Sequence, residues 1–390
     1  TLIPPPLAPP HTRTLTRAAT ATRKAAWRRP GCRKRALADL EHKRLRRRGD
    51  AQLEVHLCEG RVCNHRSSIL SVAPHQLQRH VQLLRRAALP TDVAGGPTGV
   101  FDQINQLIGQ IRGDTRMDSI TGIGMSCAGP IDTPNGIVTC IPTLPGWDGL
   151  PLARVLADST GLPARIENDG IAAALGEWRH GAGRGVGNMI YLSVSTGIGG
   201  GAVTDGRLMH GHKGIAAHIG HMRLAQDGPR CNCGAIGCFE AFAAGPALLR
   251  RAAKVAQSGS SAFLSKVAQT GNPEVKHVFE GARAGDRRCR QLVTEEALYL
   301  GQGITSAIHV LSPERVIIGG GLSNGFDLLE NGIRKVIRRD ALPAFRSVPV
   351  LRASLGDDSG LWGAASMVLA PEANAPVAIA TAPEIGMRPD

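Results

Sequence analysis

The chain has 390 residues, of which 46 are Lys or Arg and 32 are Asp or Glu, so its formal net charge at pH 7 is +14. The charge is unevenly distributed: residues 1–90 hold 19 basic and 5 acidic residues, whereas residues 91–390 hold 27 of each. Glycine follows the opposite trend, with only 3 of its 48 residues before position 91. These counts exclude a nucleic-acid-binding protein that is basic along its whole length. They divide the chain near residue 90.

The basic segment, residues 1–90, has few features of a folded domain. It contains no Phe or Tyr and a single Trp, Trp27, so it can bury little apolar surface against the entropy of ordering the chain. Apolar residues have helical spacing in two short stretches, 36–45 and 77–84, which predict marginal helices at best. We therefore expect residues 1–97 to be a separate, disordered or aberrant segment.

Several interpretations of the basic segment stay open. Its cationic runs, such as residues 43–48, suit a polyanion such as nucleic acid, but the two patterned helices of a helix-turn-helix module are not found. Residues 10–35 loosely fit an organelle transit peptide. The alternative is a frameshift or wrong start in a GC-rich gene, which would be rich in Arg, Pro, Ala, Thr, His and Cys. No run of 18 apolar residues occurs, so we expect no membrane span.

From Val100 onward the pattern changes to alternating helices and strands. Helical spacing of apolar residues predicts a helix over 100–111. We expect strands over 119–125, 165–166, 189–195, 201–204 and 316–318, and helices over 152–158, 170–178 and 361–369. Residues 244–311 are expected to be largely helical, Asp205 and Gly206 to form a hairpin turn, and residues 371–390 to be a loose tail. This alternation indicates a layered α/β architecture.

Two hydrophobic strands lead directly into glycine-rich stretches, residues 195–201 (STGIGGG) and residues 319–321 (GGG). Glycines let backbone N–H groups approach a phosphate, and the hydroxyl of Thr196 adds a donor. A glycine-rich hairpin or a tight turn explains each stretch equally well when taken alone. Two such stretches in one chain favour a nucleotide site.

Residues 167–169 (END) directly follow a predicted strand, and their last residue, Asp169, precedes Gly170, which opens a helix. An aspartate at this place is commonly a helix N-cap. The functional interpretation is a carboxylate at the mouth of a cleft, which acts as a general base toward a hydroxyl.

His221, Cys231, Cys233 and Cys238 form the most specific local pattern. They provide four ligands suited to a closed tetrahedral zinc site, which is structural because no coordination position stays open. A disulfide within residues 231–238 is the alternative. The other cysteines after residue 90 are scattered, which is typical of a reducing compartment, and we expect a cytoplasmic protein.

Taken together, these segments resemble the ROK family (repressor, open reading frame, kinase) of bacterial sugar kinases and sugar-responsive repressors. The resemblance covers about residues 98–370, and the motifs occur in the family's order. The matching stretches are residues 122–124, 128–132, 144–147, 167–169, 172–177, 195–201, 205–208, 219–222, 231–240 and 316–321.

The resemblance implies an α/β protein of the actin-like ATPase (ribonuclease H-like) fold, with two lobes around a cleft and usually a homodimer or tetramer. The N-lobe would comprise residues 98–167 with about 357–370. The C-lobe would comprise residues 168–356 and include the zinc motif.

The resemblance also implies roles for individual residues. In the kinases, the aspartate that matches Asp169 takes the proton from the sugar 6-hydroxyl, which then attacks the γ-phosphate of Mg-ATP. Residues at positions that bind or frame the sugar are Thr143, Asn168, His218, His221 and Glu240. Residues at ATP-binding positions are Thr196, Gly197, Gly319, Gly320 and Gly321.

Three departures from the family pattern bear on function. His218 stands where the family has a glutamate, so a group that can donate replaces an acceptor-only carboxylate, and Thr143 replaces an Asn. The Asp-x-Gly-Gly-Thr phosphate loop of active members is missing, which predicts an incomplete N-lobe with exposed sheet edges and weak ATP binding. We therefore expect an impaired kinase of glucose or an N-acetylated hexosamine. The alternative is a sugar-responsive repressor that contacts DNA through residues 1–90.

Overall fold

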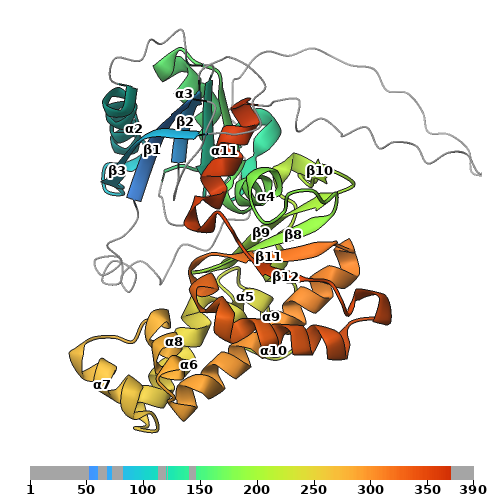
Figure 1. Ribbon diagram of the computed structural model, residues 1–390. Coiled ribbons are helices and arrows are strands. Elements are labelled where there is room, and N and C mark those ends of the chain that lie inside the picture. The colour runs from blue at the N-terminus through green and yellow to red at the C-terminus, as the bar shows by residue number, and fades with distance from the viewer. Residues whose placement is uncertain are drawn as a thin grey trace, which may run out of the picture. The chain divides into compact units, whose positions relative to one another are not determined.

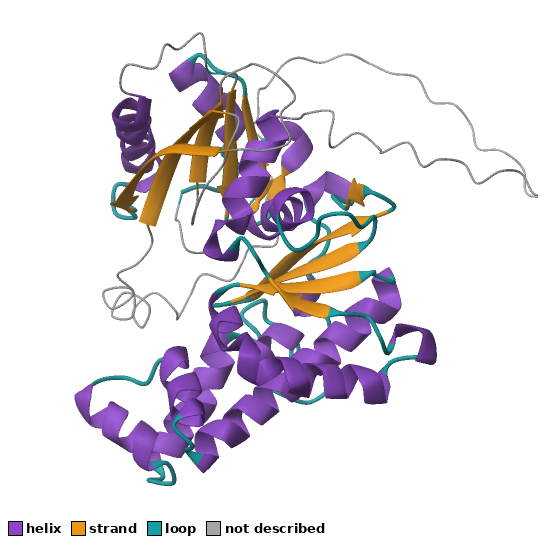
Figure 2. Ribbon diagram, in the orientation of Figure 1, coloured by secondary structure: helices purple, strands orange, loops and turns teal. Residues whose placement is uncertain are grey.

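The computed structural model describes residues 52–59, 68–72, 82–112, 120, 122–139 and 146–369 (Figure 1). These residues form two five-stranded sheets, a two-stranded ladder and the helices that accompany them (Figure 2). Within this described part, no helix is both long and apolar enough to cross a membrane.

The first sheet has the strand order β3-β1-β2-β4-β7. Its β1–β2 and β4–β7 pairs are parallel, and its β1–β3 and β2–β4 pairs are antiparallel. Two helices, α2 and α3, contribute buried apolar residues to a core with this sheet. The bounds are β1 Gln52–Glu59, β2 Ser68–Val72, β3 Gln82–Pro90, α2 Gly96–Arg112, β4 Gly122–Cys127, α3 Leu152–Thr160 and β7 Ala164–Asn168.

Three strands of the first sheet come from residues 52–90, where we expected no regular structure beyond two short helical stretches. The helix predicted over 77–84 is wrong at residues 82–84, which begin β3. In β1, Leu53, Val55 and Leu57 alternate with polar residues, which is the period-two pattern of a strand. Three strands are therefore present in a segment where we expected none.

The second sheet has the order β10-β9-β8-β11-β12, with β8, β11 and β12 parallel and the β8–β9–β10 pairs antiparallel. Asp205 and Gly206 have φ angles of 52° and 70°, so the predicted hairpin turn between β9 and β10 is confirmed. The strand β9 begins at Ile198, three residues earlier than predicted. The bounds are β8 Met189–Val194, β9 Ile198–Thr204, β10 Arg207–Leu208, β11 Arg315–Gly319 and β12 Val350–Arg352.

A set of helices packs with the second sheet around one large apolar core, in which Leu248, Ile304 and Ile333 are fully buried. This confirms that residues 244–311 are largely helical. The bounds are α5 Phe239–Ala243, α6 Gly245–Gln257, α7 Ala262–Thr270, α8 Val275–Arg283, α9 Arg287–Leu311 and α10 Phe326–Asp340.

Two helices, α4 (Asp169–His180) and α11 (Ser359–Leu369), pack closely against each other (Figure 1). Glycine makes this approach possible, because a Cβ atom on Gly363 would lie 1.7 Å from the carbonyl oxygen of Ala172, and one on Gly176 would lie 2.1 Å from that of Ser359. The helix α11 also contacts β4, and α4 contacts β8 and β9. The position of Asp169, the first residue of α4, is thereby fixed against both sheets.

Short elements complete the described chain. They are β5 Ile131–Asp132, η2 Thr133–Asn135, β6 Ile137–Val138, η3 His212–Gly214, η4 Ile219–His221, η5 Gly321–Gly325, η6 Pro343–Phe345 and η7 Gly356–Asp358.

Candidate functional site

Asn168 and Asp169 lie at the junction of β7 and α4. Asn168 is the N-cap of α4: its Oδ1 accepts hydrogen bonds from the backbone N–H groups of Gly170 and Ile171. Its amide group donates to the carbonyl oxygen of Gly129 at 2.8 Å. The capping role that is common for an aspartate here is thus carried by the preceding asparagine. Asp169 accepts one bond from the Gly170 N–H at 2.9 Å.

Asp169 is exposed to solvent, and many protein atoms also lie close to its carboxyl group. Loss of hydration on the protein side raises the pKa of this carboxyl above its ordinary value, and the backbone N–H of Gly170, the Asn168 side chain and the charge of His218 oppose that rise. A carboxylate that is open to solvent and has a raised pKa is suited to accept a proton from a bound hydroxyl.

Glu167 organises the surroundings of Asp169, although its sequence context predicted no role for it. It is fully buried, and its Oε1 accepts bonds from the Thr133 hydroxyl at 2.8 Å and the Asn168 N–H at 2.9 Å. Its Oε2 lies 2.9 Å from Nε2 of His210, and this hydrogen bond raises the pKa of His210. The only sequence signal was the position of Glu167 beside the Asn-Asp pair.

The glycines of residues 197–201 have different structural reasons. Gly200 and Gly201 lie in β9, where a Cβ atom would clash with the backbone of Tyr191 or with α4. Gly170 at the start of α4 packs on Gly200 in turn, since a Cβ on it would lie 2.6 Å from the Gly200 nitrogen. Gly199 is exposed, and a Cβ there would meet open space. Packing thus explains Gly200 and Gly201, whereas Gly199, which pairs with Ser193 in the β8–β9 ladder, has room for a side chain.

The second glycine stretch lies against the end of β8, beside the first. A Cβ on Gly320, which has a φ of +76°, would lie 2.6 Å from the carbonyl oxygen of Val194, and one on Gly321 would lie 3.6 Å from the Ser195 hydroxyl. Gly319 packs against the ring of Tyr191. The two stretches that we expected to share a nucleotide site are therefore neighbours in the structure.

The four residues of the predicted zinc site come together. Their ligand atoms all lie within 4.8 Å of one another. The sulfur atoms of Cys233 and Cys238 are 3.7 Å apart, and Nδ1 of His221 lies 3.7 Å from the sulfur of Cys231. A tetrahedral centre with metal–sulfur bonds of about 2.3 Å places its sulfur ligands about 3.8 Å apart, so this set fits zinc. Cys231, Cys233 and Cys238 are all free cysteines, so no disulfide links them.

His218 is exposed and stacks on the ring of His221, with ring centroids 6.2 Å apart. Its Nδ1 lies 3.2 Å from the carbonyl oxygen of Ala216. Ala217, which lies between Ala216 and His218, has a φ of +57°. This left-handed conformation costs free energy in a residue other than glycine. The chain thus tolerates strain at the residue that precedes His218.

Glu240 connects the metal ligands to the first glycine stretch. Its Oε2 accepts a hydrogen bond from the Ile198 N–H at 3.0 Å, and its Oε1 lies 3.5 Å from the sulfur of Cys231. Thr196, Cys231 and Glu240 also line one small cavity of about 30 Å³. The remaining sequence-predicted site residue, Thr143, lies outside the described residues.

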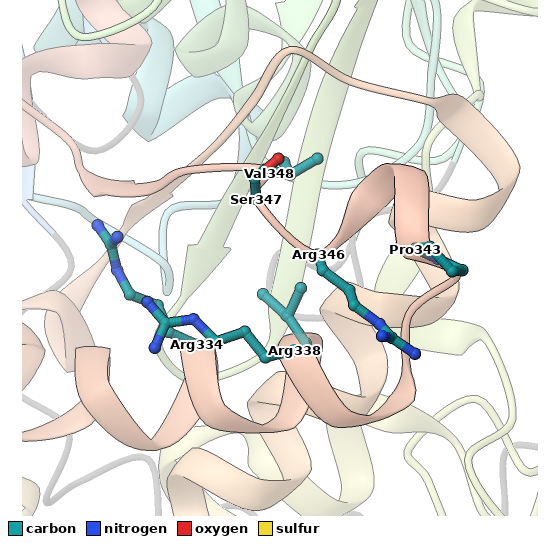
Figure 3. Close-up of a pocket in the computed structure, with 7 residues that line it drawn as sticks. Arg334, Arg338, Pro343, Arg346, Ser347 and Val348 are labelled. Carbon is teal, nitrogen blue, oxygen red and sulfur yellow. The ribbon is translucent and has the colours of Figure 1, made fainter.

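A larger hollow, of about 390 Å³, lies between α10 and the segment before β12 (Figure 3). None of the candidate site residues lines it. It is lined by Arg334, Arg338 and Arg346 among others, and Figure 3 shows the side chains of Arg334 and Arg338 extending away from that of Arg346. The guanidinium groups do not converge on one point.

Comparison with known proteins agrees with this geometry. The ROK family model matches residues 77–371, a match that begins earlier than the expected residue 98. A glucokinase of Thermotoga maritima is 36% identical over 291 residues, which cover 74% of this chain and 90% of that protein. The DNA-binding transcriptional repressor Mlc of Escherichia coli is 29% identical over 270 residues, which cover 69% of this chain and 65% of the repressor.

Solved structures give the same result. The crystal structure of a ROK family glucokinase from Streptomyces griseus, in complex with glucose and AMPPNP, matches with a TM-score of 0.65 and 32% identity. The match covers 74% of this chain and 92% of that one. The predicted actin-like ATPase fold is confirmed. With a family model that spans residues 77–371 and relatives that match over most of their length, this chain belongs to the ROK family.

Proposed function

We propose that this protein is an ATP-dependent hexose kinase, which transfers the γ-phosphate to the 6-hydroxyl of glucose or an N-acetylated hexosamine. The observation that carries the proposal is the placement of Asp169. Its exposed carboxylate stands at the start of α4, where Gly170 packs directly on Gly200 of the glycine-rich strand. A base and a phosphate-binding backbone are thereby close to each other. The match to glucokinases supports this assignment.

Asp169 acts as the general base in this proposal. It accepts the proton of the sugar hydroxyl as the hydroxyl oxygen attacks the terminal phosphorus, and its raised pKa makes it a better base than an ordinary aspartate. Mg-ATP, when bound, supplies the phosphoryl group. Asn168 keeps one amide hydrogen free of its bond to Gly129, which can orient a sugar hydroxyl. The protein's contribution is mainly positioning and charge stabilisation.

The glycine stretches form the nucleotide side of the proposed site. In this proposal, Thr196, whose side chain is exposed, and Gly197 contact the phosphates, and residues 319–321 contact the adenosine. On the sugar side, zinc bound by the His221 and cysteine set would hold the His221 ring in place. His221 in turn carries the stacked His218, whose ring nitrogen can donate to a sugar hydroxyl or accept from one.

A coupled assay for ADP release tests the proposal with glucose, mannose, N-acetylglucosamine and N-acetylmannosamine. We expect turnover with at least one of them, and a loss of about a hundredfold or more in kcat for Asp169→Asn. Turnover with none of the four sugars, or an Asp169→Asn rate equal to that of the wild type, would refute the kinase. The matched control is Asp205→Asn in the hairpin turn, which accepts no proton in the mechanism.

A sugar-responsive repressor is the second candidate. The similarity to Mlc and the excess of 14 positive charges in residues 1–90 favour it. Gel-shift titrations at two salt concentrations test it against operator-like and random DNA. DNA binding that is weakened by salt and does not depend on the DNA sequence would leave only a nonspecific cationic tail.

The proposal also includes the domain organisation and the assembly. We place the lobe boundaries near residues 97, 167 and 356, and we propose a homodimer or tetramer.

A further inference from the structure

The five-residue helix α5 connects two parts of the proposed site, the metal set and the first glycine stretch. Cys238, a residue of the metal set, is its N-cap. Glu240 on α5 accepts the Ile198 N–H of the glycine stretch. Directly after α5, the N–H of Gly245 donates to the carbonyl oxygen of Ser195 at 2.7 Å. Any shift of α5 therefore moves the metal set and the glycine stretch together.

A helix this short has little stability of its own, because most of its backbone groups lie at an end. Two arginines of α6 supply partners at its C-terminal end. Arg250 donates to the carbonyl oxygen of Ala241 at 3.0 Å, and Arg251 donates to that of Phe242 at 2.7 Å. Cations at the C-terminus of a helix also interact favourably with its dipole.

Arg251 is itself held by a carboxylate of α9. Glu296 is fully buried, and its Oε2 forms an ion pair with the Nη2 of Arg251. The guanidinium also lies over the ring of Tyr299, 5.3 Å from its centroid, and that ring contacts Phe242 of α5. A buried ion pair of this kind adds little net stability compared with apolar residues, but it fixes the geometry of its members.

We infer that Arg251, held by Glu296, is a positioning residue that sets the place of α5 and thereby couples the metal set to the glycine stretch. The part that concerns ATP rests on the proposed kinase function, whereas the part that concerns the metal does not. The fork of the Arg251 guanidinium is needed, since one Nη binds Glu296 while the other binds Phe242.

The test uses the zinc-loaded full chain and the variant Arg251→Lys, which keeps the charge beside Glu296 but cannot make both bonds at once. We expect zinc release to a chelator at 25 °C to become about tenfold faster, as for other residues that support metal ligands. The KM for ATP should rise by a similar factor, with a smaller change in kcat. The control is Glu295→Gln, whose carboxylate is partly exposed and 3.8 Å from Arg251, and which should release zinc at the wild-type rate.

Zinc release separates positioning from simple stabilisation. A purely structural role would lower the melting temperature of Arg251→Lys and leave zinc release at 25 °C unchanged, which would overturn the inference. If Arg251→Lys does not fold, Glu296→Gln takes its place. Its amide oxygen still accepts from Arg251, and it should show a smaller acceleration; a wild-type release rate in this variant also overturns the inference. Absence of kinase activity in the wild type refutes the proposed function alone.

Discussion

Glu177 offers the sharpest test of how α4 is anchored. Its carboxylate is fully buried, and every group that it contacts donates to it. Oε2 accepts from the N–H groups of Ala182 at 2.7 Å and Ser354 at 3.2 Å. Oε1 accepts from the Leu355 N–H at 2.8 Å and the Ser359 hydroxyl at 2.9 Å. The end of α4 is thereby joined to the loop that leads into α11.

The substitution Glu177→Gln keeps the shape of the side chain but turns one acceptor into an NH₂ group. In one orientation the NH₂ faces the N–H of Leu355, and in the other it faces those of Ala182 and Ser354. At least one of these half-buried or exposed N–H groups then loses its partner beside the buried side chain, and the remaining bonds lose the charge of their acceptor. With about 1–3 kcal/mol for the unpaired donor and about 1 kcal/mol for the weakened bonds, we expect the free energy of unfolding to fall by about 3 kcal/mol.

Glu314 provides the matched control. It also accepts two backbone N–H groups, from Gly187 at 2.8 Å and Asn188 at 2.9 Å, but both bonds end on the same oxygen, Oε1. A glutamine can keep both, so Glu314→Gln should cost less than about 1 kcal/mol. The measurement is urea-induced unfolding of both variants. Equal losses in the two, or a loss below about 1 kcal/mol for Glu177→Gln, would refute the reasoning from donor geometry.

Three further predictions concern the strained loop, the half-buried His180 and the metal set. Because Ala217 has a φ of +57°, Ala217→Gly should raise the free energy of unfolding by about 1 kcal/mol in urea denaturation. Burial, with Arg179 and Arg184 nearby, lowers the pKa of His180 to about 4. The unfolded state therefore binds more protons between pH 6.5 and 4, and stability should fall as the pH falls through this window, by at most about 3 kcal/mol. His180→Gln, which still donates to Ser366, should flatten that dependence in thermal melts; an unchanged profile would contradict it. Cys233→Ser should reduce zinc, measured by elemental analysis, to near zero per chain, and a full zinc content would show that Cys233 is not a ligand.

Much of the second sheet and its helices could be predicted from sequence, because the apolar periodicity and the glycine turns there indicate the same strands, helices and turns. The hairpin at Asp205 and Gly206 is confirmed there, and beside the first sheet the helix predicted after Pro151 is confirmed as α3. The start of β9 was missed, because three consecutive glycines at 199–201 read locally as a loop. Gly201 is required by the close packing of α4, which lies about thirty residues earlier in the sequence, and Gly200 by the backbone of Tyr191, so neither leaves a local signal.

The candidate site shows the same limit. The metal set could be predicted because its ligands lie within one short stretch and one preceding turn. Glu167 and His210 could not, since their hydrogen bond joins residues 43 positions apart and each is unremarkable in its own segment. The roles of Arg251 and Glu296 were equally invisible, because α6 and α9 read as ordinary amphipathic helices. Contacts between distant segments require the fold before they can be recognised.

The two sheets differ at the place that matters for the choice between kinase and repressor. In the second sheet, β8 pairs in parallel with β11 and turns through a glycine-rich hairpin into β9. In the first, β4 lies between the antiparallel β2 and the parallel β7, and β1, β2 and β3 contain no glycine. Among the described residues, these three strands therefore contain no glycine-rich stretch comparable to residues 195–201. Asp169, the metal set and Glu240 all lie outside β1, β2 and β3. Sugar binding should persist whether or not ATP binds, so calorimetric titrations with sugar alone and then with a nucleotide analogue separate the two functions.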